Sequence, residues 1–203
     1  MTLYQTVSQL FSAGSETTVT SLRWSLLYMM AYPEIQSRIQ NEIDCVVGRD
    51  RLPRVGDALP LTEATIMEVQ RYSSIAPLGV PHVATEHTTL QGRNIPKGTL
   101  LFCNIWAVHH DPDVWTNPDQ FRPERFLSED GKVYQPKEYI PFSTGHRKCL
   151  GEHLAKMELF IIFSHLLHQF TFKSPPDVEL SMDGTLGVTN APKPFQCVAI
   201  QRD

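Results

Sequence analysis

Long hydrophobic runs are missing from this sequence of 203 residues. A transmembrane helix needs roughly 20 consecutive, mostly apolar residues, and every apolar run here is far shorter. The first residues, MTLYQTVSQLFSAG, also lack a basic flank, a continuous apolar stretch and a small-residue cleavage site. We therefore expect neither a membrane-spanning helix nor a secretory signal peptide in this chain.

Paired cysteines and clustered basic charge are also missing. The four cysteines (Cys45, Cys103, Cys149 and Cys197) lie far apart and form no C-x-x-C pair. This spacing favours neither a disulfide framework nor a zinc site with paired ligands, and it indicates a reducing, intracellular setting. The net charge is −4, and lysines and arginines are spread along the chain. Because binding to a phosphate backbone needs a clustered basic face, we expect no nucleic-acid partner.

The composition that remains is that of a packed globular domain. Hydrophobic residues make up 41% of the chain and charged residues 20%, which separates it from disordered sequences. No internal repeat and no Gly/Ser-rich linker divides the chain. The length and the absence of a linker predict one domain.

Helical spacing of apolar residues predicts four helices. They span residues 3–31, 33–47, 61–74 and 150–168. Pro33 opens the second helix and Gly48 stops it, while the third is expected to start from Thr62 and to end before Pro77. The apolar stripe predicted for the last helix consists of Leu150, Leu154, Met157 and Ile161.

Short strands are predicted between and after these helices. Residues 82–90 and 99–105 are rich in β-branched and apolar types, and turn residues separate them. The chain after the last helix is predicted to form a terminal β-hairpin. Residues 111–141 hold five prolines, and an irregular segment of that length is usually functional. The predicted fold class is mainly α with small β-sheets (α+β).

The strongest local pattern surrounds Cys149, where the last predicted helix begins. Backbone N–H groups and the helix dipole favour a thiolate at such a position. Gly145 and Gly151 remove side chains where a flat ligand approaches the backbone. Arg147 offers a fork of donors suited to a carboxylate, and Phe142 is placed to pack beside the sulfur and keep water from it.

Two interpretations of Cys149 follow. Most isolated intracellular cysteines are small buried hydrophobes. The neighbours of Cys149, however, complete the pattern F-x-x-G-x-R-x-C-x-G at every fixed position, and this pattern resembles the haem-thiolate loop of cytochrome P450s. The resemblance implies that Cys149 is the iron ligand of haem b and that Arg147 binds a haem propionate. It also implies that the cofactor is bordered by Phe142, Gly145 and Gly151.

The first supporting motif is A-G-S-E-T-T at residues 13–18, which is similar to the family's oxygen-activation motif. The resemblance places Ala13 beside the haem and gives Glu16 and Thr17 a role in proton delivery during oxygen activation. In a helix, a threonine hydroxyl bonds to the carbonyl four residues earlier and distorts the helix locally. Taken alone, such a cluster is more often a packing or bending feature.

Two further motifs follow in the order that the family has. Glu68 and Arg71 form an E-x-x-R pair on one helix face, and residues 123–126 read P-E-R-F. An exposed pair of this kind contributes only about 0.3–0.5 kcal/mol and is common. The resemblance implies instead that Glu68, Arg71 and Arg125 form a structural triad that anchors the irregular segment to the core.

The histidines receive different interpretations. His82 matches a position where the family places a second propionate partner, and otherwise it is a hydrogen-bonded strand residue. His109 and His110 match no ligand spacing and are interpreted as ordinary loop residues. The segments TEATIMEVQR, IPKGT and GEHLAKMELF are most similar to animal microsomal P450s of family two.

For a complete enzyme, the resemblance implies a haem-thiolate monooxygenase. One atom of O2 enters a lipophilic substrate such as a fatty acid, a steroid or a xenobiotic. The implied electron source is NADPH through a cytochrome P450 reductase, with cytochrome b5 as a further partner, at the cytoplasmic face of the endoplasmic reticulum membrane. His146, Lys148 and Lys156 either meet an acidic reductase face or form a solvated surface. Residues 74–82 and 186–187 resemble segments that border the substrate pocket, and Ile75, Leu78 and Val80 suggest an apolar ligand.

The resemblance begins within the family's long central helix. We therefore expect residues 1–203 to form the C-terminal half of a single P450 domain, with the N-terminal half and its membrane anchor absent. One face of the cofactor pocket is then open, the first and last helices lack partners for their apolar sides, and solubility is poor. Two alternatives remain: a truncated, non-catalytic fragment without haem, and a P450-like isomerase or dehydratase. The second usually lacks the acid–threonine pair that Glu16 and Thr17 provide.

Overall fold

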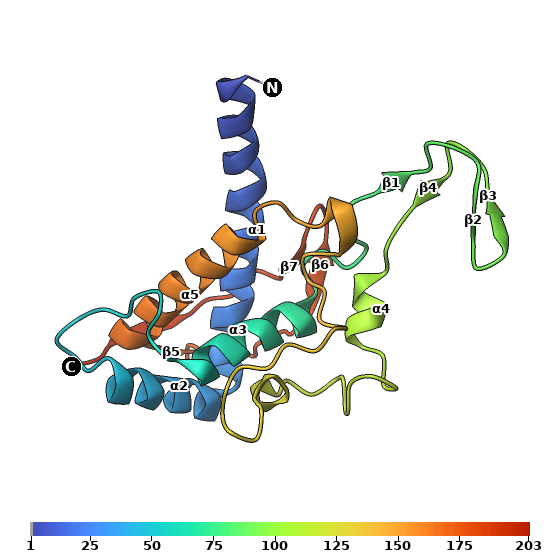
Figure 1. The fold of residues 1–203 in the computed structure, drawn as a ribbon. Helices are drawn as coiled ribbons and strands as arrows, with labels where there is room; N and C mark the ends of the chain where they lie inside the picture. Colours follow the sequence, from blue (N-terminus) through green and yellow to red (C-terminus); the bar gives the residue numbers. More distant parts are fainter. Residues whose placement is uncertain (1) are drawn as a thin grey trace.

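The computed structural model describes residues 2–203. Within this range, helices form the body of the molecule, and short strands form four separate two-stranded antiparallel sheets (Figure 1). The predicted fold class, mainly α with small β-sheets, is confirmed. None of the helices in this range combines the length and the apolar character that a bilayer span requires.

The predicted helices are present, and a short additional one appears. The helices are α1 (Leu3–Ala31), α2 (Pro33–Val46), α3 (Pro60–Ser73), α4 (Ile105–His109) and α5 (Glu152–Gln169). Proline occupies the first position of both α2 and α3, where its missing N–H is not needed and its fixed φ suits the helix.

The start of α3 differs from the prediction, because Thr62 does not cap it. The carboxylate of Glu42, on α2, accepts hydrogen bonds from the backbone N–H groups of Leu61 (2.7 Å) and Thr62 (2.9 Å). The Thr62 hydroxyl also donates to this carboxylate (2.7 Å). A side chain from a neighbouring helix therefore satisfies the free N–H groups at this helix end.

The core lies where the C-terminal half of α1 packs against α2, α3 and α5. Its largest fully buried apolar side chains include Trp24, Tyr28, Ile39 and Phe163. The N-terminal half of α1 projects beyond the other helices (Figure 1), and there Tyr4 and Phe11 are exposed by 81% and 73%. The exposed apolar side expected for the first helix is therefore present.

The apolar stripe predicted for α5 is wrong. Leu150 precedes the helix and is 99% exposed, and Leu154 is also exposed. The buried side chains are instead Leu159, Phe160, Phe163 and Leu167. Because α5 carries apolar residues on several sides, more than one stripe has helical spacing, and periodicity alone does not select the buried one.

The strands pair in four separate places. The pairs are β1 (His82–Val83) with β4 (Leu100–Leu101), β2 (Thr88–Leu90) with β3 (Arg93–Ile95), β5 (Phe170–Lys173) with β8 (Val198–Gln201), and β6 (Gly184–Leu186) with β7 (Asn190–Pro192). The first four strands form an arm that reaches away from the helices (Figure 1). The single terminal hairpin was an incomplete prediction, because only β6 and β7 form a hairpin while β8 returns to pair with β5.

The irregular segment of residues 111–141 is attached to α3 by buried charges. Arg71 Nε lies 2.7 Å from Glu68 Oε2, and both side chains have 0% exposure. Arg125, in the short 3-10 helix Pro123–Phe126, places its Nε 3.0 Å from Glu68 Oε1. The backbone N–H of Arg122 donates to the same oxygen (2.8 Å). The structure therefore brings together the three residues that the sequence motifs single out.

The remaining donors of the two arginines bind backbone carbonyls. Arg71 donates to the carbonyls of His109 (2.7 Å) and Pro118 (2.9 Å). Arg125 donates to the carbonyls of Thr116 (3.1 Å) and Gln120 (3.0 Å). A buried ion pair is tolerated only when its polar atoms are hydrogen-bonded, and here those bonds hold a segment that has almost no regular secondary structure.

We expect Arg71→Met to lower the free energy of unfolding by about 3–5 kcal/mol, because the Glu68 carboxylate is then buried without its partner. Urea denaturation followed by circular dichroism measures the change. The matched control is Lys193→Met, which removes an exposed ion pair between Lys193 and Asp183 (2.7 Å). This control is expected to change stability by no more than about 1 kcal/mol. Equal effects of the two substitutions would contradict the account.

Candidate functional site around Cys149

Cys149 lies in a closed loop just before α5. The loop contains the 3-10 turn Gly145–Arg147, and the Cys149 N–H donates to the carbonyl of Phe142 (2.9 Å). The helix starts at Glu152, so Cys149 precedes the helix and is not part of its first turn. Cys149 is exposed and forms no disulfide with another described residue.

The two glycines of the loop leave its surface open. A Cβ added at Gly145 or at Gly151 would meet no other heavy atom within 4 Å. Gly145 has φ +74°, a conformation that side-chain-bearing residues rarely adopt. Gly145 is therefore required by the backbone, whereas Gly151 contributes open space only.

Phe142 does not shield the sulfur within this chain. Phe142 is half-buried, yet Cys149 remains exposed. The ring of Phe142 instead lies beneath the Lys156 ammonium, which is 5.7 Å from the ring centroid. Lys156 also pairs with Glu152 (2.8 Å), as does Lys148 (3.2 Å). The hydrogen bond from Lys156 is the main cause that holds the pKa of Glu152 below its usual range.

The polar residues of α1 show the predicted local bond and an unpredicted contact. Thr17 Oγ1 donates to the carbonyl of Ala13 (2.8 Å), as the sequence predicts. Glu16 Oε1 accepts from the hydroxyls of Thr20 (3.4 Å) and Thr189 (3.3 Å). Thr189 lies between β6 and β7, so Glu16 contacts a hairpin distant in sequence. No local pattern in the sequence indicates this contact.

The two predicted propionate partners are exposed donors. His82 is in β1, opposite Leu101 of β4, and Arg147 ends the short 3-10 turn. Among residues 2–203, neither side chain has a hydrogen bond or ion pair to another residue. Their donors are therefore available to an acidic ligand.

His109 is the site-related residue that the sequence analysis missed. It is not a loop residue: it ends α4 and has 0% exposure. Its Nδ1 lies 3.2 Å from the Ser74 hydroxyl, and its Nε2 accepts a hydrogen bond from the Ile140 N–H (3.1 Å). The signal for this helix was Asn104, whose side chain caps α4 by accepting from Ala107 N–H (3.0 Å). In such a helix His109 shares a face with the buried Ile105, four residues earlier.

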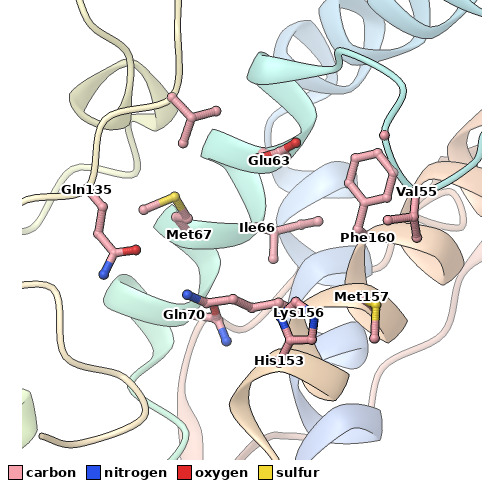
Figure 2. Close-up of a pocket in the computed structure, with 12 residues that line it drawn as sticks. Val55, Glu63, Ile66, Met67, Gln70, Gln135, His153, Lys156, Met157 and Phe160 are labelled. Atoms are coloured by element: carbon pink, nitrogen blue, oxygen red, sulfur yellow. The ribbon is translucent and has the colours of Figure 1, made fainter.

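A cavity of about 300 Å³ lies beside α3 and α5. Figure 2 shows side chains of both helices around it, with Met157 and Phe160 from α5 facing Ile66 from α3. None of the residues predicted from the sequence to bind haem or to activate oxygen lines this cavity. It is therefore separate from the Cys149 loop, although Lys156 reaches both places.

Comparison with known proteins identifies related sequences along the whole chain. A sequence model of the family "Cytochrome P450" matches residues 1–199. Cytochrome P450 2U1 of Bos taurus is 48% identical over 202 residues, which is 98% of this chain and 37% of the relative. Cytochrome P450 2J2 of Homo sapiens is 47% identical over 193 residues, 94% of this chain and 38% of the relative.

A third relative has a name that states its activity. Steroid 17-alpha-hydroxylase/17,20 lyase of Oryzias latipes is 47% identical over 205 residues, which is 98% of this chain and 40% of that protein. The chain thus spans well under half the length of the curated relatives that it matches.

The stability of the chain is expected to fall as the pH falls below the ordinary pKa of histidine. Burial lowers the pKa of His109 from 6.5 to about 3, with smaller contributions from Arg71 and His110. Between these values the unfolded state binds the proton and the native state does not, so acid favours unfolding. The contribution reaches at most about 1.4 kcal/mol per pH unit. The contribution of His109 to the free energy of unfolding is fully present above about pH 6.5 and is lost progressively toward pH 3.

Urea denaturation between pH 7 and pH 4.5 tests this expectation. The comparison is with His109→Gln, whose amide does not titrate, so that other ionisable groups cancel. The stability of the wild type should fall more steeply than that of the variant. Parallel curves would mean that His109 is not buried as the neutral ring.

Proposed function

Because the chain belongs to the cytochrome P450 family, we propose that it carries the haem-thiolate site of a monooxygenase. The proposed reaction inserts one atom of O2 into a lipophilic organic molecule and releases the other as water. The observation that carries the proposal is the complete F-x-x-G-x-R-x-C-x-G pattern, with Cys149 exposed in an open loop. The exposed apolar side chains of Leu78 and Val80 support a lipophilic substrate.

The residues of the loop fit haem b. A porphyrin offers one metal, two carboxylates and a flat apolar body. Cys149 supplies a sulfur that is free of disulfide bonds, and His82 and Arg147 supply unengaged donors for the carboxylates. The open surface at Gly145 accepts a flat group without steric conflict. The 99% exposed Leu150 provides an apolar contact next to the sulfur.

Haem supplies the oxygen chemistry when it is bound, and its thiolate ligand donates electron density that favours O–O cleavage, a general property of P450s. In this chain, Cys149 is proposed to hold the iron. Thr17 donates its own hydroxyl proton to Ala13, so the Thr17 oxygen is left to accept a hydrogen bond. Glu16 has one oxygen held by Thr20 and Thr189, and its other oxygen is proposed to carry the proton.

The proposed electron donor is NADPH through a cytochrome P450 reductase, with cytochrome b5 as an additional partner. Lys148 and Lys156 share the single carboxylate of Glu152, which leaves a net positive charge beside the Cys149 loop. A positive surface there supports docking of an acidic partner face. For the full-length protein, we propose association with the endoplasmic reticulum membrane at its cytoplasmic face.

A second candidate function is a non-catalytic fragment that binds no haem. Large apolar side chains of α1 such as Tyr4 and Phe11 are exposed. This exposure favours the alternative for the chain taken alone.

Reconstitution of the chain with haemin distinguishes the two candidates. After reduction under carbon monoxide, we expect the strongly red-shifted Soret band that a thiolate ligand gives. The band should disappear in Cys149→Ser, because a hydroxyl is a much poorer ligand for iron, and difference spectroscopy measures it.

The matched control is Cys45→Ser, since Cys45 is an exposed cysteine on α2, outside the loop. This variant should keep the band. A band that survives Cys149→Ser would overturn the proposed ligand. If the intact chain does not bind haem in stoichiometric amount, the result would favour the non-catalytic fragment.

A further inference from the structure

We propose that His109 is a positioning residue for the Cys149 loop. Its ring accepts a hydrogen bond from the backbone N–H of Ile140, just before the loop. We propose that this bond orients the backbone hydrogen bond between Phe142 and Cys149 that closes the loop. The functional meaning of this role rests on the proposed haem-thiolate function. The positioning of the loop by His109 involves only residues of this chain, so it can be tested without haem.

The hydrogen bonds of the ring define its protonation. The Ile140 N–H donates to Nε2, so Nε2 carries no proton. In the neutral ring the proton is therefore on Nδ1, which donates to the Ser74 hydroxyl (3.2 Å). That hydroxyl in turn donates to the carbonyl of Arg71 (2.9 Å). The result is a one-way chain of donors from the irregular segment to the C-terminal end of α3.

The neighbouring residue is held in the same way. Tyr139 is buried, and its hydroxyl donates to Gln70 Oε1 on α3 (2.6 Å). Its ring stacks on the ring of His109, with centroids 5.9 Å apart and an interplanar angle of 21°. Two consecutive residues, Tyr139 and Ile140, are thus fixed to α3 and α4 by buried side chains.

The fixed segment leads directly into the loop. The Ile140 carbonyl accepts from the Ser143 N–H (2.9 Å), and Ser143 has φ +63°. This turn sets the direction of Phe142, whose carbonyl accepts the Cys149 N–H (2.9 Å). Both peptide groups of Ile140 are therefore used, one by His109 and the other by the turn that starts the loop. Loss of the His109 acceptor leaves a part-buried N–H without a partner and frees this turn.

Amide hydrogen exchange of the folded chain tests the proposal. In His109→Phe, which keeps an aromatic ring but removes the acceptor, we expect exchange at the Ile140 and Cys149 amides to accelerate about tenfold, as for the loss of one buried hydrogen bond. His109→Gln restores an acceptor and a donor, so it should recover most of the protection. Tyr139→Phe, a milder change, should accelerate the same amides to a smaller degree.

The control variant is His168→Phe. His168 is also a buried histidine that bonds a backbone carbonyl, that of Gly48 (2.8 Å), but it lies at the other end of α5. It should leave Cys149 exchange unchanged and accelerate exchange only at the end of α2, where the Val47 N–H lies next to the Gly48 carbonyl that loses its partner. Equal acceleration of Cys149 and Val47 in His109→Phe, or no acceleration at Cys149, would overturn the proposal.

A second readout separates this inference from the proposed function. If haem binds, His109→Phe should broaden or shift the thiolate Soret band of the carbon monoxide complex while His109→Gln restores it. If haem does not bind, the exchange result still decides whether His109 positions the loop. If His109→Phe accelerates exchange at Cys149 but not at Val47 and the chain binds no haem, the positioning role is supported. The same result counts against a haem site in the chain alone.

Discussion

The buried ion pair between Glu68 and Arg71 is the constraint on which the rest of the structure depends. Both side chains are fully buried, and charges in such a place must have their polar atoms hydrogen-bonded. Most of those bonds come from the irregular segment: the Arg122 N–H, the Arg125 guanidinium and the Pro118 carbonyl. The His109 carbonyl, at the end of α4, supplies a further bond. The hydrogen bonds that satisfy these two charges therefore hold a long, proline-rich segment in place. That segment forms few hydrogen bonds of regular secondary structure. That segment leads directly into the Cys149 loop. The ion pair therefore fixes the chain from which the loop starts.

The sequence was informative where the signal is local. Helical periodicity with Pro33 and Gly48 locates the helices, and the spacing of residues 142–151 identifies the loop, because these features depend on neighbours in the chain. The buried side of α5, the pairing of β8 with β5 and the contact of Thr189 with Glu16 were not predictable in this way. Each depends on which distant segment is packed alongside. For His109, the Asn104 cap was a local signal of the short helix, but the bonds of the ring depend on two other segments and were not predictable from neighbours in the chain.

The residues of the candidate site lie on three elements, and different interactions hold each element in place. Thr17 and Glu16 lie on α1, where the helix itself sets the Thr17 hydroxyl against the Ala13 carbonyl. His82 lies on the projecting arm of short strands. Cys149 lies in a loop that is held by a few backbone hydrogen bonds, such as those from the Cys149 N–H to Phe142 and from the Lys148 N–H to Gly145, and by the segment before it. Of these, the loop has the least regular structure around it, which is why buried side chains such as those of His109 and Tyr139 matter most there.

Hydrogen exchange of Glu68→Gln against the wild type tests the central claim most directly. Gln keeps the shape of Glu68 but removes the charge that Arg71 and Arg125 share. We predict that the amides of Arg122, Tyr134 and Ile140 lose protection from exchange together, since the irregular segment opens as one unit. The amide of Val47, at the end of α2, should keep its protection. Acceleration at Arg122 alone would contradict the account, because the ion pair would then hold only its immediate neighbour.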